Sequence, residues 1–130
     1  MGHMQPDPEL EGLATRLFDL ARAGETETLR AYVEAGVPVN LTNDRGDTLL
    51  MLAAYHGHAE TVRVLVSLGA DPGRANDRGQ TPPAGAVFRK EPDVIRELLS
   101  AGADPDAGTL SATDTARMFG QDEYQKWFGH

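Results

Sequence analysis

The chain contains no cysteine, and this absence excludes both a disulfide framework and thiol chemistry. Aromatic residues are scarce, at 6% of 130 residues, and there is a single tryptophan. No apolar run approaches the about 20 residues that a membrane-spanning helix needs, and no secretory leader opens the sequence. Together these absences predict a cytoplasmic protein without membrane association.

Patterns that carry catalysis or bind metals are missing as well. The few serines stand outside any nucleophile elbow, and no glycine-rich phosphate loop follows a strand. His56 and His58 lie close together, but no further ligand stands at a recognised metal spacing. The sequence therefore predicts a protein that is not an enzyme and that holds neither a metal nor a cofactor.

Acidic residues outnumber basic ones, which gives a net charge of −8 and an isoelectric point of about 4.8. Such a chain does not favour a phosphate backbone, so nucleic acid is not an expected partner. The net charge suits a basic or neutral partner, and it also serves solubility. Nearly all of the basic residues are arginine, which favours a GC-rich, bacterial genome as the source.

A repeat with a period of 33 residues organises the chain. The tetrapeptide Asn-Asp-Arg-Gly at 43–46 recurs at 76–79, a shift of 76 − 43 = 33, and Gly-Ala-Asp-Pro at 69–72 recurs at 102–105 with the same shift. Two separate blocks with one offset predict a stacked-repeat fold. In such a fold each unit buries its apolar face on its neighbours.

Each unit reads as a turn, a short helix, a tight glycine turn and a second helix. Residues 43–46 have turn chemistry, and Thr48 can cap a short apolar helix that ends at Gly57. A second helix over about 59–68 carries apolar residues at helical spacing and ends at Gly69. The units therefore predict an all-α protein.

The motifs of this unit resemble the ankyrin repeat. Residues 48–53 and 81–86 match its T-P-L-H-x-A signature loosely, whereas 57–58 match its GH turn and 69–71 its GAD ending. The resemblance implies an ankyrin-repeat solenoid of about four helix pairs with β-turn fingers. It also implies a structural role for His58, with the ring bonded to backbone.

The resemblance covers nearly the whole chain and divides it into repeats. We expect an expression remnant at residues 1–4 and a single domain over 5–130. Within that domain we expect an N-terminal capping repeat at 8–43, full repeats at 44–76 and 77–107, and a C-terminal capping repeat at 108–130. The last unit reaches its helix cap three residues early, since 111 − 81 = 30, so its turn should be truncated or absent.

The second full repeat departs from the family pattern at Pro83, Gly85 and Lys90. A proline early in a helix is tolerated, but Gly85 should weaken the short helix by about 1 kcal/mol relative to alanine. Lys90 replaces the turn glycine and needs either a strained backbone or a different turn. We therefore predict that this short helix is the least stable in the array.

In ankyrin arrays the turn tips and the solvent faces of the short helices line a concave surface that binds partners. Carried onto this chain, the resemblance implies a set of positions in two successive repeats. These are Thr42, Asp44, Arg45, Asp47, Tyr55 and His56, and then Ala75, Asp77, Arg78, Gln80, Phe88 and Arg89.

Tyr55 and Phe88 are 33 residues apart, so they should stack as neighbours on this surface. A helical array needs no aromatic residues at outward positions for its own core, and tyrosine and arginine are enriched at binding hot spots. We therefore predict a strip that binds a protein partner, formed by Tyr55, Phe88, Met118 and Phe119 and edged by Arg45, Arg78, Arg89 and the turn aspartates. The alternative is that Tyr55 and Phe88 fold over the turns as ordinary surface.

The predicted function is non-catalytic protein–protein interaction by a monomer. One alternative is a structural or engineered scaffold that forms a homodimer through Trp127 and Phe128, although these aromatics could instead cover the open face of the last repeat. Another alternative is a small-molecule or metal-dependent activity in the groove, for which Asp44, Asp47 and Asp77 on successive turns could hold a cation.

Overall fold

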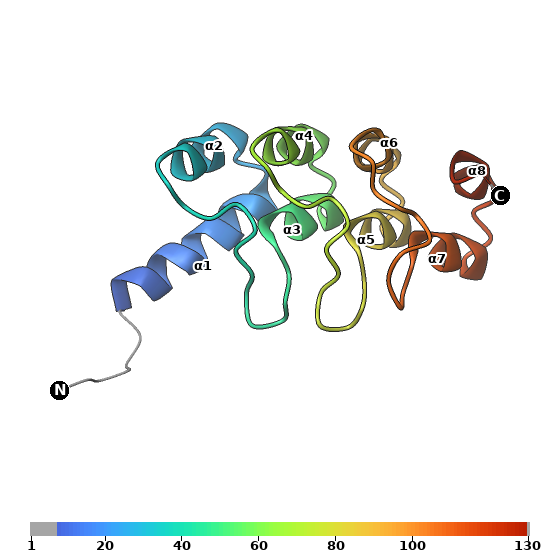
Figure 1. Ribbon diagram of the computed structural model, residues 1–130, viewed down its shortest axis with the longest axis horizontal. Helices are drawn as coiled ribbons and strands as arrows, with labels where there is room; N and C mark the ends of the chain where they lie inside the picture. Colours follow the sequence, from blue (N-terminus) through green and yellow to red (C-terminus); the bar gives the residue numbers. More distant parts are fainter. Residues whose placement is uncertain (1–7, 130) are drawn as a thin grey trace.

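The computed structural model describes residues 8–129, with side chains described from residue 11 onward. The expression remnant expected at residues 1–4 lies outside this range. Within it, eight α-helices form four pairs, which confirms the all-α repeat solenoid expected from the sequence (Figure 1). In chain order they are α1 (Pro8–Ala23), α2 (Thr26–Glu34), α3 (Leu49–Tyr55), α4 (Ala59–Ser67), α5 (Pro82–Phe88), α6 (Pro92–Ser100), α7 (Ala112–Met118) and α8 (Asp122–Trp127).

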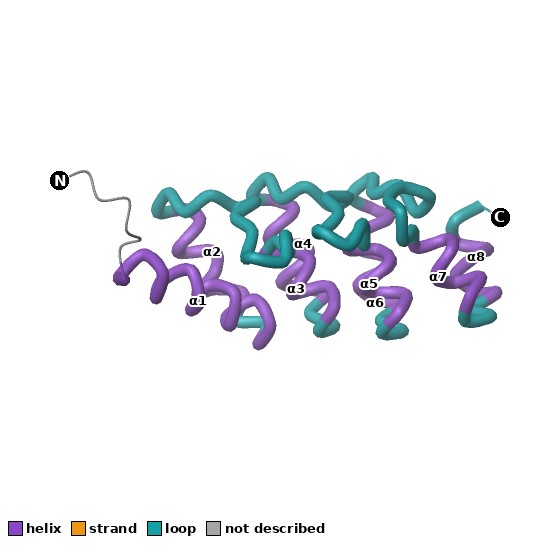
Figure 2. Tube along the Cα trace, turned by 90° about the horizontal axis from the view of Figure 1, so that it is seen from below, coloured by secondary structure: helices purple, strands orange, loops and turns teal. Residues whose placement is uncertain are grey.

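The helices lie in two rows. Helices α1, α3, α5 and α7 form an inner row, α2, α4, α6 and α8 form an outer row, and long loops project beyond the inner row (Figure 1). Seen from below, those loops follow one edge of the array and the tight turns within each pair follow the other (Figure 2). Because α1 packs on α3, α3 on α5 and α5 on α7, each repeat contacts chiefly its neighbours.

The short inner helices begin with side-chain caps. Thr48, Thr81 and Ser111 each accept a hydrogen bond on the hydroxyl from the backbone N–H three residues later, at 3.0, 3.3 and 3.0 Å. Each cap satisfies one of the N–H groups that have no partner within the helix. The capping role expected of Thr48 is confirmed, and Ser111 repeats it at the shortened spacing.

The apolar core follows the contact between the two rows. In α3 every residue from 49 to 54 is buried, as expected for a helix that neighbours cover on most sides. Burial of these side chains removes apolar surface from water, which is the main favourable term in folding. The largest fully buried side chains include Leu17, Leu29, Leu49, Leu50, Leu65, Ile95 and Leu98.

The turn within each helix pair has one residue in the left-handed backbone region. Gly24, Gly57 and Gly120 have φ values of 74°, 81° and 67°, and Lys90 takes the same place with φ of 57°. Among the described residues Lys90 alone has a positive φ without being glycine. Of the two alternatives that the sequence left open at Lys90, a strained backbone or a different turn, the structure has the strained backbone.

The loops that project from the array form three fingers, at residues 41–48, 74–81 and 106–111. The side-chain oxygen of Asn43 accepts from the backbone N–H groups two and four residues later at 2.9 and 3.0 Å, and that of Asn76 does the same at 3.0 and 3.1 Å. The third finger has no such asparagine and is shorter, as the sequence predicted. The Leu110 N–H closes it onto the Gly79 carbonyl at 3.1 Å.

Candidate protein-binding surface

A row of aromatic side chains follows the C-terminal ends of the inner helices. The rings of Tyr55 and Phe88 stack with centroids 6.3 Å apart and an interplanar angle of 14°. Phe119 meets Phe88 edge to face at 5.7 Å and 71°. The stacking that the 33-residue spacing predicted is confirmed, and the row continues into the last repeat. Offset and edge-to-face contacts of this kind hold aromatic rings in defined positions.

The apolar side chains in this region are open to solvent. Phe88 is 48% exposed, Met118 72%, Phe119 51% and Leu110 44%. Among the side chains that the structure describes, these four are the exposed large hydrophobic residues, and all four line one pocket. Such a concentration differs from the single scattered apolar residues that are normal on a protein surface.

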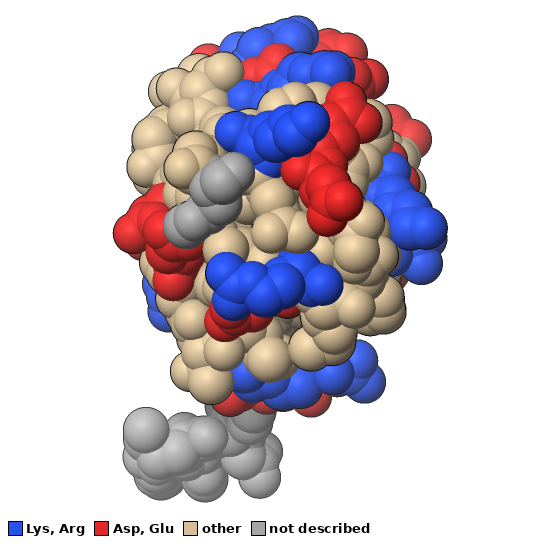
Figure 3. All heavy atoms as spheres, turned by 90° about the vertical axis from the view of Figure 1, so that its right-hand side faces the viewer, with Lys and Arg blue, Asp and Glu red and all other residues tan. Residues whose placement is uncertain are grey.

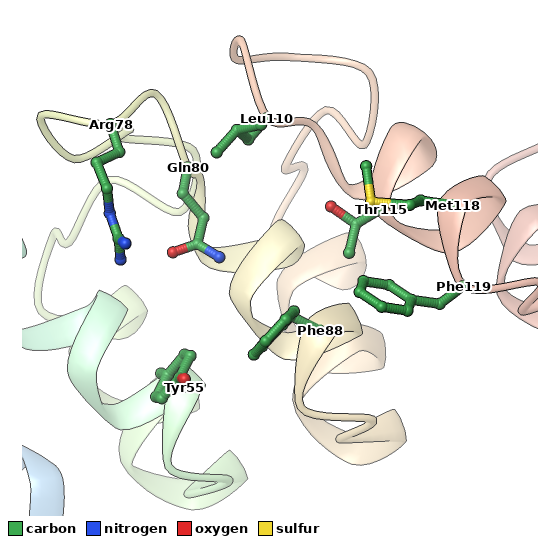
Figure 4. A pocket seen from close by; sticks show the side chains of 8 residues that line it. All are labelled: Tyr55, Arg78, Gln80, Phe88, Leu110, Thr115, Met118 and Phe119. Atoms are coloured by element: carbon green, nitrogen blue, oxygen red, sulfur yellow. The ribbon is translucent and has the colours of Figure 1, made fainter.

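This aromatic pocket has a volume of about 290 Å³ and opens between the second and third fingers and the ends of α3, α5 and α7 (Figure 4). Gln80 and Leu110 lie above it on adjacent fingers, where their backbones form an isolated parallel bridge. Arg78 extends from the second finger towards the helices. The lining residues are Tyr55, Arg78, Gln80, Phe88, Leu110, Thr115, Met118 and Phe119.

Gly85 of α5 lies next to Tyr55, which lines this pocket. A Cβ atom at this position would lie 2.8 Å from Met51 Cε and 3.6 Å from the Tyr55 ring, so a side chain here would push on both neighbours. The equivalent residue one repeat earlier is Leu52, since 85 − 33 = 52, and it is buried. The glycine that weakens α5 by its propensity therefore also lets Met51 and Tyr55 pack across the repeat boundary.

Arginines surround a second hollow beside the first. This arginine pocket has a volume of about 200 Å³ between the ends of α1 and α3 and the first two fingers, and Tyr55, Arg78 and Gln80 belong to both pockets. Its charged lining consists of Arg22, Arg45 and Arg78 together with a single carboxylate, Asp47. Asp47 already accepts a hydrogen bond from the Asn76 side chain at 2.9 Å.

The electrostatic surroundings of His56 report the same excess of positive charge. Partial burial lowers the pKa of His56 from 6.5, and electrostatic interactions with Arg89, His58 and Arg22 lower this pKa further. The Arg89 guanidinium lies 5.0 Å from the centre of the Tyr55 ring, a cation–π distance. The lining of the arginine pocket is thus more basic than acidic, in a chain whose net charge is −8.

The turn aspartates lie apart from the aromatic pocket. Asp44, Asp47 and Asp77 line a hollow of about 330 Å³ between the first two fingers, together with Arg45 and Arg78. Among the described residues no group of three or more histidine, cysteine, aspartate or glutamate side chains is placed to hold a metal ion. Nothing in the geometry therefore adds support to a cation site at these aspartates.

Sequence reasoning placed six of the eight residues of the aromatic pocket and missed Leu110 and Thr115. Leu110 precedes the Ser111 cap as Gln80 precedes Thr81, so an alignment on the caps would have found it. Thr115 occupies the place of Gly85 by the same shift of 30 residues. His58, expected to serve structure, places its Nε2 atom 2.7 Å from the Arg22 carbonyl oxygen, which confirms that role.

The aromatic residues of α8 and its C-cap lie partly buried. Tyr124, Trp127 and Phe128 pack against the core, and the Arg96 guanidinium lies 4.5 Å from the centre of the Trp127 ring. Viewed from the C-terminal end, basic and acidic side chains alternate with uncharged ones (Figure 3). No helix in the described part of the chain has the length and apolar character needed to cross a membrane.

Comparison with known proteins agrees with this architecture. A family model for ankyrin repeats in three copies matches residues 17–109. The ankyrin repeat protein PA3287 of Pseudomonas aeruginosa is 48% identical over 50 residues, which is 38% of this chain and 29% of that protein's length. The crystal structure of the human ASB11 ankyrin repeat domain matches with a TM-score of 0.76 at 24% identity, over 86% of this chain and 52% of that one. Since the family model covers most of the sequence, the chain belongs to the ankyrin-repeat family.

Proposed function

We propose that this chain binds a protein partner through the aromatic and arginine pockets of its concave surface and catalyses no reaction. Ankyrin repeats are in general protein–protein interaction modules. The observation that carries the proposal is that the four exposed large apolar side chains of the described region all line the aromatic pocket. Removing them from water would favour association, at roughly 25 cal/mol per Å² of apolar surface buried.

The residue types around the aromatic pocket also favour a protein partner. Interfaces are enriched in tyrosine, phenylalanine, methionine and arginine, and all four types are present. The pocket volume of about 290 Å³ lies at or below the range of roughly 300–1,000 Å³ that is typical of small-molecule sites. Side chains of a partner fit such a hollow better than a cofactor does.

Self-association through the C-terminal helix is the second candidate function. It is less well supported, because Trp127 and Phe128 pack partly against the core and Arg96 stacks on the Trp127 ring. Light scattering across a range of concentrations distinguishes the two, since a monomer at all concentrations argues against a homodimer. A Trp127→Ala variant that stays folded should then leave partner binding unchanged.

Capture from a lysate of the source organism tests the main proposal. The double variant Tyr55→Ala/Phe88→Ala should retain its helical circular dichroism and lose a protein that the wild type retains. Glu34→Ala/Glu60→Ala is a matched control, because both glutamates are exposed on outer helices. Equal capture by the wild type and the Tyr55/Phe88 variant would contradict binding at the concave surface.

A further inference from the structure

We propose that the partner segment bound here is acidic next to its apolar anchor. One bulky apolar side chain enters the aromatic pocket, and an aspartate or glutamate within a few residues of it pairs with Arg78 and its neighbour Arg45. This inference rests on the proposed function and adds the chemistry of the partner. An acidic partner segment is the opposite of the basic or neutral partner that the net charge of −8 suggests.

The apolar half of the inference comes from the shape of the aromatic pocket. Phe88 and Phe119 meet edge to face, which leaves ring surface of both exposed to a guest. Leu110 and Met118 are exposed as well, and all four line a volume of about 290 Å³. This hollow suits one large side chain, because a buried aromatic or aliphatic anchor in such a pocket is the usual centre of a binding hot spot.

The charged half comes from arginines that lack an acidic partner. Among the described side chains, the five ion pairs include neither Arg45, nor Arg78, nor Arg89. Arg78 is also the only charged residue that lines the aromatic pocket. An arginine presents a planar fork of donors that matches a carboxylate, so a partner's Asp or Glu is the group these side chains recognise best.

For a partner bound at the two pockets, the charges close to them matter more than the net charge of the whole chain. Interactions between exposed charges are largely screened beyond about 8 Å at physiological ionic strength. Remote glutamates therefore contribute little to the electrostatic potential at the two pockets. In the arginine pocket Arg22 is paired with Asp19 and Asp47 is hydrogen-bonded to Asn76, which leaves Arg45 and Arg78 without an ion pair. Asp44 and Asp77 lie in the separate hollow between the first two fingers, whereas Arg78 is the charged residue of the aromatic pocket, so a basic residue next to the anchor would be repelled there.

A nucleic acid strand is the other anionic ligand that arginines and aromatic rings could bind. Single-strand binding requires a positively charged groove that follows the backbone over several nucleotides. Here the fingers also carry Asp44 and Asp77, and the whole chain has an excess of eight negative charges. A peptide with one or two carboxylates fits this mixed surface better than a strand with a phosphate at every step.

Selection from a phage-displayed library of short random peptides tests the inference. Wild-type protein should enrich sequences in which an aromatic or large aliphatic residue stands within a few positions of Asp or Glu. A synthetic peptide of that kind, followed by fluorescence anisotropy, should bind Arg78→Glu about 10-fold more weakly or worse, as expected for loss of a charge-assisted contact. Replacing its acid by lysine should restore binding to that variant.

Arg16→Glu is the matched control, since it makes the same charge change at an exposed residue of α1 outside both pockets. It should leave affinity unchanged. Enriched peptides without an acid, or equal affinity for wild type and Arg78→Glu, would overturn the inference. If those peptides still fail to bind Tyr55→Ala/Phe88→Ala, the proposed function stands.

Three further outcomes would also overturn the inference. One is the absence of any peptide enriched over the Tyr55→Ala/Phe88→Ala variant, in which case lysate capture alone decides the proposed function. The second is displacement of the peptide by a single-stranded RNA. The third is its displacement by a second copy of the chain, in a dimer that the same double substitution abolishes.

Discussion

Replacing Lys90 by glycine should stabilise the protein. Lys90 occupies the position after the C-cap of α5, with φ of 57°. Its N–H bonds to the Val87 carbonyl at 3.0 Å, and the next N–H bonds to the Ala86 carbonyl at 2.9 Å. This is the hydrogen-bond pattern of a Schellman motif, which normally has glycine in the left-handed place.

The expected magnitude follows from two opposing terms. Holding a residue with a Cβ atom in the left-handed region costs about 1–2 kcal/mol. Glycine adds conformational freedom to the unfolded chain, which costs about 0.4–1 kcal/mol. Lys90→Gly should therefore raise the free energy of unfolding by about 0.5–1 kcal/mol, or the melting temperature by about 2–4 °C.

Urea unfolding followed by circular dichroism measures this change, and two variants control it. Lys90→Ala removes the charge but keeps a Cβ atom, so it should be less stable than Lys90→Gly. Gly120→Ala makes the reverse change in the same turn one repeat later, where φ is 67° and a Cβ would meet no atom within 4 Å. It should destabilise by a similar amount. Equal stability of the two Lys90 variants would refute the strain argument.

The remaining predictions concern the stability of α5, the side chain of Gln121 in the last repeat and the pKa of His56. Amide protons of α5 should exchange faster than those of α3 in the wild type; equal protection would contradict the predicted weakness of α5. The side-chain amide of Gln121 is buried without a partner, and Gln121 follows Gly120 as His58 follows Gly57. Gln121→His should therefore stabilise the fold by about 1 kcal/mol in a urea melt, because the imidazole can bond a backbone carbonyl as that of His58 does. Because the folded pKa of His56 lies below 6.5, the unfolded chain binds more protons, and stability contributed by this residue is lost as the pH falls below 6.5. Proton NMR titration should show this low pKa and its partial return towards 6.5 in Arg89→Gln.

The parts of the fold that depend on local chemistry could be predicted from the sequence. Turn asparagines, capping threonines and turn glycines act within a few residues of themselves, so their spacing was enough to place the helices. The stacking of Tyr55 on Phe88 followed from the 33-residue period, because equal positions in successive repeats lie side by side.

The parts that depend on contacts between repeats could not be predicted in the same way. Leu110 enters the aromatic pocket because the third finger is shorter, and a change of spacing obscures which residues are equivalent. The absence of a side chain at Gly85 leaves room for Met51 of the preceding repeat, which only the structure shows. The loss of helix stability that this glycine causes can be inferred from the sequence of α5 alone. Net charge likewise describes composition and not position, so it suggested a basic or neutral partner although Arg22, Arg45 and Arg78 line the arginine pocket.

The nearest-neighbour packing of the inner helices also determines how the chain reaches its folded state. The contacts of α3 with α1 and α5 join segments about one repeat apart, so each can form by closing a short stretch of chain. Folding can therefore begin at any adjoining pair of repeats and extend in both directions, and the terminal pairs are the first to separate. A partner seated across α3, α5 and α7 would connect three repeats at once. Binding would thereby make the array unfold more cooperatively.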